Sequence, residues 1–350
     1  MKSKGVKIVL IIILAILIIA LVNFMIYAII NRNNDYSVKF SLIAFGDNTE
    51  KIFEKEYEAG ELDKINVNVS SSNVFIEKAD VDKIRITAYG EKDEEINETI
   101  NNNELSITKS KTKVFIFAMF YWCDEKIIIQ VPNDCDEEFN IHTSSGDIVV
   151  SNLENNVINL ESSSGRIECG NINNGNFRSS SGDITVGSGN EITLQVSSGS
   201  INAGDFNRLS AVASSGDIEV ENIGEGTIKT SSGKISVGET RRLQAQASSG
   251  NININKINEY CNLATSSGSI DIETLNIVEN SSISAKSGDV DINSKNDIYV
   301  EAETKSGDAE TKNNNRMSEI VLKVTTTSGN IQVDWFLRVI EYFCLKLYTV

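Results

Sequence analysis

One short motif recurs along most of this chain and limits what the chain can fold into. The string Ser-Ser-Gly-Asp-Ile occupies residues 144–148, and variants of it follow about 17 residues apart in the middle of the chain and up to 22 apart at its C-terminal end. The glycines of the eleven copies are Gly146, Gly165, Gly182, Gly199, Gly216, Gly233, Gly250, Gly268, Gly288, Gly307 and Gly329. A period of this length indicates a repeat architecture in which each copy is one structural unit.

Apolar and polar residues alternate on both sides of each glycine. Apolar residues stand two and four positions after it, as Ile148 and Val150 do, and five positions before it, as Ile141 does. Polar residues such as Glu161 and Glu168 fill the positions between them. Period-two alternation is typical of a strand with one buried face. Glycine would supply the unusual backbone angles that a sharp corner between two such strands requires.

A unit of about 17 residues cannot bury its apolar face alone, whereas stacked copies share one interior. We therefore predict an all-β protein over residues 136–333, a parallel β-solenoid with rungs of about 17 residues and two strands per rung. At about 4.8 Å per rung, eleven rungs make a rod of about 50 Å. A β-sandwich of hairpins is the alternative, but hairpins would not repeat one corner eleven times.

The residues that follow the glycines are expected to form a ladder along the stack. Like charges at neighbouring positions of a sheet are destabilising, and in the regular section the acids alternate with Arg166, Ser200 and Lys234. Only Asp289 and Asp308 are expected to be neighbours. A calcium ladder is the functional alternative, but the glycine-rich nonapeptide of calcium-binding β-rolls is absent. This favours a structural role for the acids, and for the serine columns as well.

Two irregular segments flank the repeat. Residues 59–135 are predicted to hold a degenerate first rung, with Ser72 at the glycine position, followed by inserted capping strands. Within them, the apolar run 114–122 is too short to cross a membrane as a helix. We interpret this run as a buried strand that caps the first rungs, the alternative being an exposed aromatic loop that touches lipid or ligand. Residues 334–350 are strongly apolar and are predicted to cap the other end, because open strand edges promote aggregation.

The N-terminal segment predicts a membrane anchor. Residues 8–30 carry no charge and would form a helix of roughly 35 Å, long enough to cross a bilayer. Three lysines lie in residues 1–7 and Arg32 follows the apolar stretch, so residues 1–7 are expected in the cytoplasm and residues 31–58 are expected to be a juxtamembrane linker outside. A cleaved signal peptide is the rival, but the stretch is too long and no A-x-A site follows it. We predict a single-pass protein of the cell membrane with an extracytoplasmic solenoid.

The composition excludes several chemistries. The single histidine, His142, argues against a Ser-His-Asp triad and against a multi-histidine metal site. The cysteines form no C-x-x-C pair, and both a Cys123–Cys135 bridge and unpaired thiols remain open. The formal charge is −17, and it is −21 without the four cationic residues of the N-terminal segment, so the surface repels phosphate backbones. We predict no catalytic residue, no cofactor, no metal site and no nucleic-acid partner, whereas cationic peptides remain possible partners.

The repeated corners, and the segment that ends in IIIQVP at residues 127–132, resemble the bacterial putative adhesin family of β-strand-repeat domains of unknown function, to which LiaG-like envelope proteins belong. The resemblance covers about residues 60–333, and the membrane anchor also agrees with LiaG-like members. It implies the solenoid fold and transfers no catalytic residue, since the family has none established.

Three functions are compatible with these observations. The first is a membrane-anchored, non-enzymatic cell-envelope interaction or adhesin-like protein that binds envelope polymers or partner proteins, with a link to envelope stress as a further expectation. The second is a polymerising scaffold of solenoids that stack end to end. The third is a polysaccharide-acting β-helix enzyme, against which the outward acids Glu168, Glu219, Asp271, Asp291 and Glu310 are expected to be dispersed.

Overall fold

The computed structural model describes residues 38–41, 44–46, 49–92, 94–111, 115–118, 121–123, 125–312 and 314–335. The chain divides into two compact units, residues 1–46 with 111–122 and residues 47–110 with 123–350. All regular structure in the described ranges is β-structure. Those ranges contain no helix that is long and apolar enough to cross a membrane. The predicted transmembrane segment, residues 8–30, lies outside the described residues, and so do residues 336–350 of the predicted C-terminal cap.

The smaller unit contains two pairs of short strands. β1 (Val38–Ser41) pairs in parallel with β9 (Phe115–Ala118), and β2 (Ala44–Gly46) pairs with β10 (Tyr121–Cys123). Two of these strands, β9 and β10, overlap the apolar run 114–122, and they pair with β1 and β2. The interpretation of this run as a cap of the first rungs stays a prediction.

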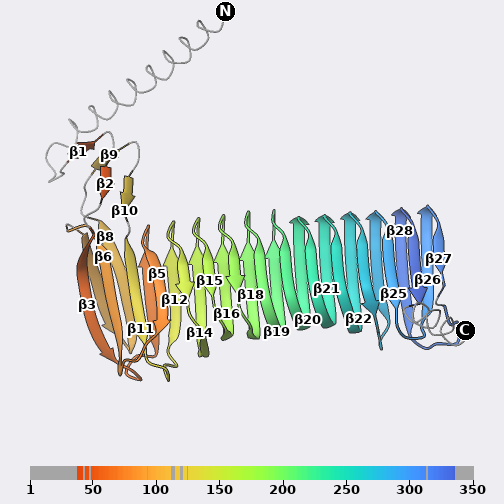
Figure 1. Cartoon of the computed structure of the whole chain (residues 1–350), viewed down its shortest axis with the longest axis horizontal. Helices are drawn as coiled ribbons and strands as arrows, with labels where there is room; N and C mark the ends of the chain where they lie inside the picture. Colours follow the sequence, from red (N-terminus) through yellow and green to blue (C-terminus); the bar gives the residue numbers. More distant parts are fainter. Residues whose placement is uncertain are drawn as a thin grey trace, which may run out of the picture. The chain divides into compact units, whose positions relative to one another are not determined.

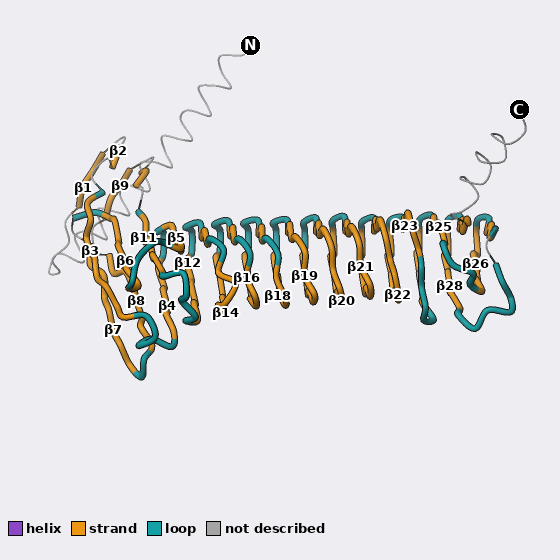
Figure 2. The backbone as a smooth tube through the Cα atoms, turned by 60° about the horizontal axis from the view of Figure 1, so that its bottom comes forward, coloured by secondary structure: helices purple, strands orange, loops and turns teal. Residues whose placement is uncertain are grey.

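The larger unit is a parallel β-solenoid of about 11 turns that lie about 18 residues apart, which confirms the predicted fold (Figures 1 and 2). Its N-terminal strands are β3 (Glu50–Glu58), β4 (Lys64–Val69), β5 (Asn73–Lys78), β6 (Lys83–Gly90), β7 (Glu94–Asn101), β8 (Glu104–Lys111), β11 (Lys126–Val131), β12 (Glu138–Thr143) and β13 (Ile148–Val150). The middle holds β14 (Leu153–Ser162), β15 (Ile167–Cys169), β16 (Ile172–Ser179), β17 (Ile184–Val186), β18 (Gly189–Val196), β19 (Ile201–Ala213), β20 (Ile218–Ser232), β21 (Ile235–Ser249) and β22 (Ile252–Ser267). The C-terminal strands are β23 (Ile270–Leu275), β24 (Ser281–Ser287), β25 (Val290–Ser294), β26 (Tyr299–Ser306), β27 (Ala309–Thr311), β28 (Val321–Ser328) and β29 (Ile331–Trp335).

Each rung has two strand segments that meet at a Ser-Ser-Gly corner. We call the sheet formed by the segments before the corners the long sheet, and the sheet formed by the segments after them the short sheet. Neighbouring rungs pair in parallel and in register, so that Ile201 lies beside Ile218 and Ala211 beside Ile228. From β19 to β22, the short-sheet segment of one rung continues without a break into the long-sheet segment of the next (Figure 2).

One continuous column of apolar side chains fills the interior. The inward residues of the β19 rung, all buried, are Ile201, Ala203, Phe206, Leu209, Ala211 and Ala213. The three apolar positions that the sequence predicts are therefore core positions. Three further positions, filled here by Phe206, Leu209 and Ala213, complete the interior. Each rung covers the apolar side chains of the next, which an isolated rung could not do.

Close stacking is the reason for glycine at the corners. A Cβ atom at Gly216 would lie 1.9 Å from the carbonyl oxygen of Gly199 in the preceding rung, and one at Gly182 would lie 2.0 Å from that of Gly165. The predicted reason, an unusual backbone angle, holds only at the last four corner glycines, where φ lies between +146° and +157°. In the regular section the corner requires the absence of a side chain, and not the conformational freedom of glycine.

Side-chain oxygens complete the hydrogen bonding at the corners. The Ser162 hydroxyl accepts the N–H of Gly165 at 2.8 Å, and the Asp217 carboxylate accepts the N–H of Lys234 in the next rung at 2.7 Å. Six other side chains in this column also accept the N–H of the register neighbour in the next rung of the stack, namely those of Asn73, Asp147, Asp183, Asn251, Asp289 and Asn330. The acids of the ladder thus satisfy backbone donors, which supports the structural interpretation of this column.

The last two rungs stack in the reverse of chain order. β28 lies between β24 and β26, and β29 lies between β25 and β27 (Figure 1). The chain passes through the outermost rung, formed by β26 and β27, and then returns through residues 312–320 to the rung beneath it. Asn330 consequently lies between Asp289 and Asp308, donating its N–H to the first and accepting the N–H of the second. The prediction that these two acids are neighbours is wrong, and the intervening rung separates the like charges.

The N-terminal end of the solenoid is closed by antiparallel strands. β4 and β5 form a rung beside β12 and β13, and Ser72 stands at its corner. A Cβ atom added at Gly146 would lie 2.0 Å from the carbonyl oxygen of Ser72, a distance similar to those at the other corners. β8 and β11 form one further parallel layer beside β4 and β5. On the short-sheet side, β6 pairs antiparallel with β11 and β3 pairs antiparallel with β6. β6 and β11 fall within residues 59–135, where the sequence predicts capping strands, and β3 comes from residues 50–58.

A buried ion cluster joins three elements at this end. Lys109 Nζ on β8 lies 2.6 Å from Glu94 Oε2 on β7 and 2.8 Å from Glu125 Oε2 just before β11. The three side chains are only 3 to 4 % exposed, and Lys109 also contacts the Ser72 hydroxyl at 3.3 Å. The attraction between the opposite charges offsets part of the free-energy cost of burying them, so each charged group depends on its partners.

Candidate functional site

One outward-facing row of the long sheet contains no charged residue over eleven consecutive rungs. It stands six positions before each corner and consists of Ser106, Asn66, Asn140, Asn159, Asn176, Thr193, Ser210, Thr227, Gln244, Asn262 and Ser282, in order of stacking. We call it the uncharged row. Charge enters this column only in the last two rungs, with Lys323 and Glu301. In a chain with 23 % charged residues, such a row is a distinctive surface.

The two ends of the uncharged row are bonded within the row. Asn140 donates to Asn66 at 2.9 Å, Asn159 donates to Asn140 at 2.7 Å, and Ser282 donates to Asn262 at 3.0 Å. Among the residues that the structure describes, the side chains of the four middle members Thr193, Ser210, Thr227 and Gln244 make no hydrogen bond to another protein group. The middle of the row therefore presents hydroxyl and amide groups that solvent or a ligand must satisfy.

A row of alternating charge runs beside it, eight positions before each corner. Glu191, Arg208, Glu225, Arg242 and Tyr260 are register neighbours in this order. Arg208 lies 3.0 Å from Glu191, and Glu225 lies 3.6 Å from Arg241. Every charge of this row therefore has an opposite charge beside it, and the patch is close to neutral.

Arg242 is the most firmly held of these cations. Its guanidinium donates to both carboxylate oxygens of Glu279, at 2.6 and 2.9 Å, and lies 5.0 Å from the centre of the Tyr260 ring. The hydrogen bonds between Arg242 and Glu279 lower the pKa of that carboxyl and raise the pKa of the guanidinium. A bidentate pair of this kind fixes the orientation of both groups, and Arg242 in turn supports the partly exposed Tyr260 ring.

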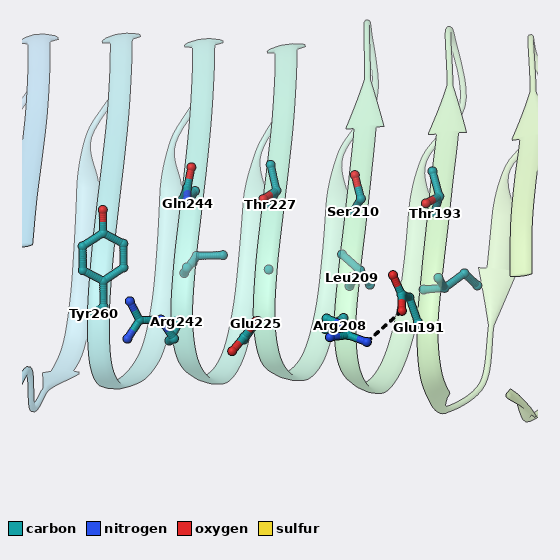
Figure 3. Close-up of a pocket in the computed structure, with 13 residues that line it drawn as sticks. Glu191, Thr193, Arg208, Leu209, Ser210, Glu225, Thr227, Arg242, Gln244 and Tyr260 are labelled. Carbon is teal, nitrogen blue, oxygen red and sulfur yellow. Dashed lines mark hydrogen bonds and ion pairs between the residues drawn. The ribbon is translucent and has the colours of Figure 1, made fainter. Parts of the chain in front are cut away.

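The two rows enclose a hollow of about 300 Å³ on the outer face of the long sheet. Figure 3 shows Thr193, Ser210, Thr227 and Gln244 in one line across the strands, with Glu191, Arg208, Glu225, Arg242 and Tyr260 in a second line beside it. The hollow exists because the first line consists mainly of short side chains and the second of long ones. Between the two lines lies the backbone of the inward residues Leu209, Gly226 and Leu243, which are register neighbours.

This hollow can bind but has no groups for bond-breaking chemistry of a familiar kind. Its hydroxyls have no histidine or free carboxylate beside them to act as a base. The part of the chain that the structure describes holds no group of three or more acidic, histidine or cysteine side chains placed to bind a metal. Burial raises the pKa of Cys135, Cys169 and Cys261 to about 12, and all three are free thiols, so they are not nucleophiles at neutral pH.

The outward acids considered from the sequence lie on the short sheet, and two of them come together. Glu168 and Glu219 stand in separate rungs, but Asp271 and Asp291 are direct register neighbours. Desolvation, followed by the charges of Asp271 and Asp334, raises the pKa of the Asp291 carboxyl. The expectation that these acids are dispersed is therefore wrong for this pair. Their two rungs stay in register although the spacing between the corner glycines is 20 residues here.

A second hollow of about 410 Å³ lies on the short sheet and is acidic. Asp271 lines it together with Glu219, Glu221 and Glu273, but Asp291 does not. The carboxyls of Asp271 and Asp291 therefore do not face one shared hollow.

Sequence reasoning did not find the uncharged row. The signal was present, because the position six before each corner glycine carries Asn, Thr, Ser or Gln from Asn140 to Ser282. It could have been recognised by aligning the copies on the glycine and comparing the outward positions one by one.

The comparisons with known proteins agree with the repeat. The model of the family described as Toastrack DUF4097 matches residues 62–238 and 185–338. A search of the curated proteins gives no match.

Solved structures that match part of this chain include three from Bacteroidales. A putative adhesin from Parabacteroides merdae has 13 % identity and a TM-score of 0.45, and the match covers 67 % of this chain and 99 % of that one. A putative adhesin from Bacteroides fragilis has 17 % identity and a TM-score of 0.40, with 64 % and 96 % covered. A putative lipid binding protein from Parabacteroides distasonis has 17 % identity and a TM-score of 0.38, with 85 % and 100 % covered.

Proposed function

Since the chain belongs to the Toastrack DUF4097 family, we propose that it is a non-enzymatic, adhesin-like binding protein of the cell envelope. We propose further that it binds through the outer face of the long sheet. The observation that carries this proposal is the hollow over Thr193, Ser210, Thr227 and Gln244, where unbonded polar groups repeat at every rung beside paired charges. A flat array of this kind suits an extended partner better than a compact substrate.

A membrane anchor completes this function. Residues 8–30 have the length and composition of a transmembrane helix, and the lysines before them favour an orientation with the solenoid outside the cytoplasm. Tethering would hold the binding face within the envelope. Protease added to intact cells should remove the solenoid while residues 1–7 stay protected, and full protection of the solenoid would contradict the proposed topology.

End-to-end polymerisation is less well supported. A filament of stacked solenoids needs an open parallel edge at both ends. At the N-terminal end, β6 runs antiparallel to β11 and β3 runs antiparallel to β6. A rung from a second copy would find no parallel partner on that side, which favours a binding role over a scaffold.

The experiment that tests the function is co-sedimentation of the purified full-length chain with insoluble envelope fractions, chiefly peptidoglycan sacculi with and without their attached polymers. The variant Ser210→Arg/Thr227→Arg places two long cations in the hollow, and we expect it to abolish retention. The control Ser236→Arg/Asn253→Arg makes the same change at register neighbours on the short sheet and should be retained like the native chain. Equal retention of both variants would show that another face binds, and no retention of the native chain would contradict the binding function itself.

A further inference from the structure

We propose that the hollow on the long sheet takes an uncharged polysaccharide chain, laid along the uncharged row and across the rungs. This inference rests on the proposed binding function and narrows its ligand class. Three properties of the face support it: the row repeats at every rung, the charges beside it are paired, and its middle hydrogen-bonding groups have no protein partner in the described structure.

The repeat of the row fits a polymer. Thr193, Ser210, Thr227 and Gln244 follow one another in register, one per rung, at the spacing of about 4.8 Å that neighbouring strands impose. A ligand that runs along the solenoid meets one hydroxyl or amide at each step. A linear chain of sugar rings presents hydroxyl groups at short, regular intervals, so one polymer can use several rungs at once, each contact being weak.

The charge of the face excludes ionic polymers. Glu191 is paired with Arg208, and Arg242 is paired with Glu279 at both carboxylate oxygens. A polyanion therefore finds no unpaired cation in the hollow and meets a chain of formal charge −17. A polycation would find more carboxylates on the short sheet, around Glu219, Glu221 and Asp271, than in this hollow. Only a neutral ligand would leave these ion pairs undisturbed.

The hydrogen-bonding state of the row favours the middle of the solenoid. Amides bond to one another in the rungs of Asn66, Asn140 and Asn159, and a ligand there would have to break these bonds. In the hollow the four middle side chains have no protein partner in the described structure. Hydroxyls and amides both donate and accept, as sugar hydroxyls do, so they can satisfy a neutral glycan without a net charge.

The Tyr260 ring closes the hollow at one end. It is partly exposed and is held by Arg242 at 5.0 Å from the ring centre. An oriented aromatic ring beside polar groups offers an apolar surface for the carbon face of a sugar, in addition to the hydrogen bonds along the row.

The test is isothermal titration of the full-length chain with linear neutral hexasaccharides of glucose, mannose and N-acetylglucosamine, and with hexagalacturonate as the anionic comparator. The full-length chain is kept in solution with a detergent that has no sugar headgroup, so that the detergent does not compete with the hexasaccharides for the hollow. We expect a neutral hexasaccharide to bind and hexagalacturonate to bind at least about tenfold more weakly. The affinity for the neutral ligand should be unchanged between low and high salt, because no net charge is involved.

Isosteric variants locate the binding. Thr193→Val/Thr227→Val removes two hydroxyls of the row without changing shape or strand preference, and it should weaken neutral binding at least about fivefold through the loss of two hydrogen bonds. Thr185→Val removes an exposed threonine hydroxyl on the short sheet and should leave binding unchanged.

Two outcomes would overturn the inference. One is the absence of binding to every neutral hexasaccharide while the same preparation still sediments with envelope fractions, which leaves the proposed function standing. The other is native affinity in the Thr193→Val/Thr227→Val variant, which places the sugar elsewhere. Failure to sediment with any envelope fraction would instead strike at the binding function.

Discussion

The regular middle of the solenoid and its two ends follow the same corner chemistry but different rules of assembly. From β14 to β23, each rung stacks on the rung that precedes it in the chain. At the C-terminal end, the rung of β28 and β29 lies beneath the rung of β26 and β27, which precedes it in the chain. At the N-terminal end, antiparallel strands replace further rungs. The corner motif therefore determines what a rung is, but not which rung lies next to it.

The connections at the C-terminal end also differ from those in the middle. In the middle, a spacing of 17 residues is just enough for one rung, so the chain can only step to the adjacent level. Between Gly307 and Gly329 the spacing grows to 22 residues, and the connection from β27 to β28 reaches back by one level. Once the loop is long enough, side-chain compatibility decides the order, and Asn330 between Asp289 and Asp308 is more favourable than the two acids side by side.

The order of the last rungs gives the largest, all-or-none prediction. Ser284 and Thr325 are register neighbours, whereas Ser284 and Glu303 are two rungs apart. In a background without the native Cys123 and Cys344, Ser284→Cys/Thr325→Cys should form a disulfide on mild oxidation. Ser284→Cys/Glu303→Cys should not, because a separation of about 9.6 Å exceeds the range of roughly 7 Å that a disulfide allows. The opposite pattern, measured by thiol titration and mass spectrometry, would show that the rungs stack in chain order.

The corner of the regular middle should be the most sensitive position for stability. Gly216→Val places a branched side chain against the backbone of Gly199, which cannot move without breaking the stack. We expect a loss of about 5 kcal/mol or more in the free energy of unfolding, measured with denaturant. Gly60→Ala is the matched contrast, because its Cβ meets nothing within 4 Å although φ is +82°. It should cost only about 1 to 2 kcal/mol, and equal losses would favour backbone angle over space as the role of these glycines.

The N-terminal end should depend on its buried ions. Lys109→Met removes the buried ammonium that contacts the carboxylates of Glu94 and Glu125, and we expect a loss of about 3 kcal/mol or more in unfolding free energy. Arg208→Met removes an exposed partner of Glu191 in the middle of the solenoid and should cost less than about 1 kcal/mol. Similar losses for the two variants would mean that burial does not distinguish these ion pairs.

The ladder after the glycines should respond to the acceptor and not to the charge. Asp217→Asn keeps an oxygen that can accept the N–H of Lys234 and should change stability by no more than a few tenths of a kcal/mol. Asp217→Ala removes the acceptor and should cost about 1 kcal/mol. If thermal melts placed both variants at the same loss, the carboxylate charge would be the stabilising feature.

The smallest expected effect concerns the adjacent acids Asp271 and Asp291, and we expect the substitution of Asp291 to stabilise the chain. The pKa of Asp291 is raised in the folded chain by desolvation and then by the charges of Asp271 and Asp334. A raised folded pKa gives stability that is full below the unfolded pKa and is lost as the pH rises through the folded value. Asp291→Asn should therefore stabilise the chain by a few tenths of a kcal/mol at pH 7 and leave it unchanged near pH 3. A loss of stability at pH 7 would contradict the proposed repulsion.

Much of the fold was predictable because it depends on residues close in sequence. The alternation around Ile148, Val150 and Ile141 predicted which residues are buried, and Ser72 was recognised in the glycine position of a degenerate rung. The strand partners of the run 114–122 were not predictable, because an apolar strand shows only that it needs a partner, and not which one. Here β9 pairs with β1, a strand nearly eighty residues earlier in the chain.

The candidate site was not predicted, although every residue in it stands at a regular position. Thr193, Ser210 and Thr227 become one row only when their rungs are placed in register, and their significance depends on which neighbours already bond to each other. The bidentate bond from Arg242 to Glu279 spans 37 residues, so no local pattern indicates it. Both features arise from stacking.

The sequence by itself determined the rung. Its corner, its inward and outward residues and its period follow from local alternation and from the need for a position without a side chain. Only the tertiary structure decided the order of the last rungs, the antiparallel closure of the first ones and the pairing of the row of alternating charge. The physical reason is that the rungs are nearly equivalent to one another, so that local residues cannot specify a neighbour. Long connections, exposed strand edges and pairs of charges far apart in the chain make that choice.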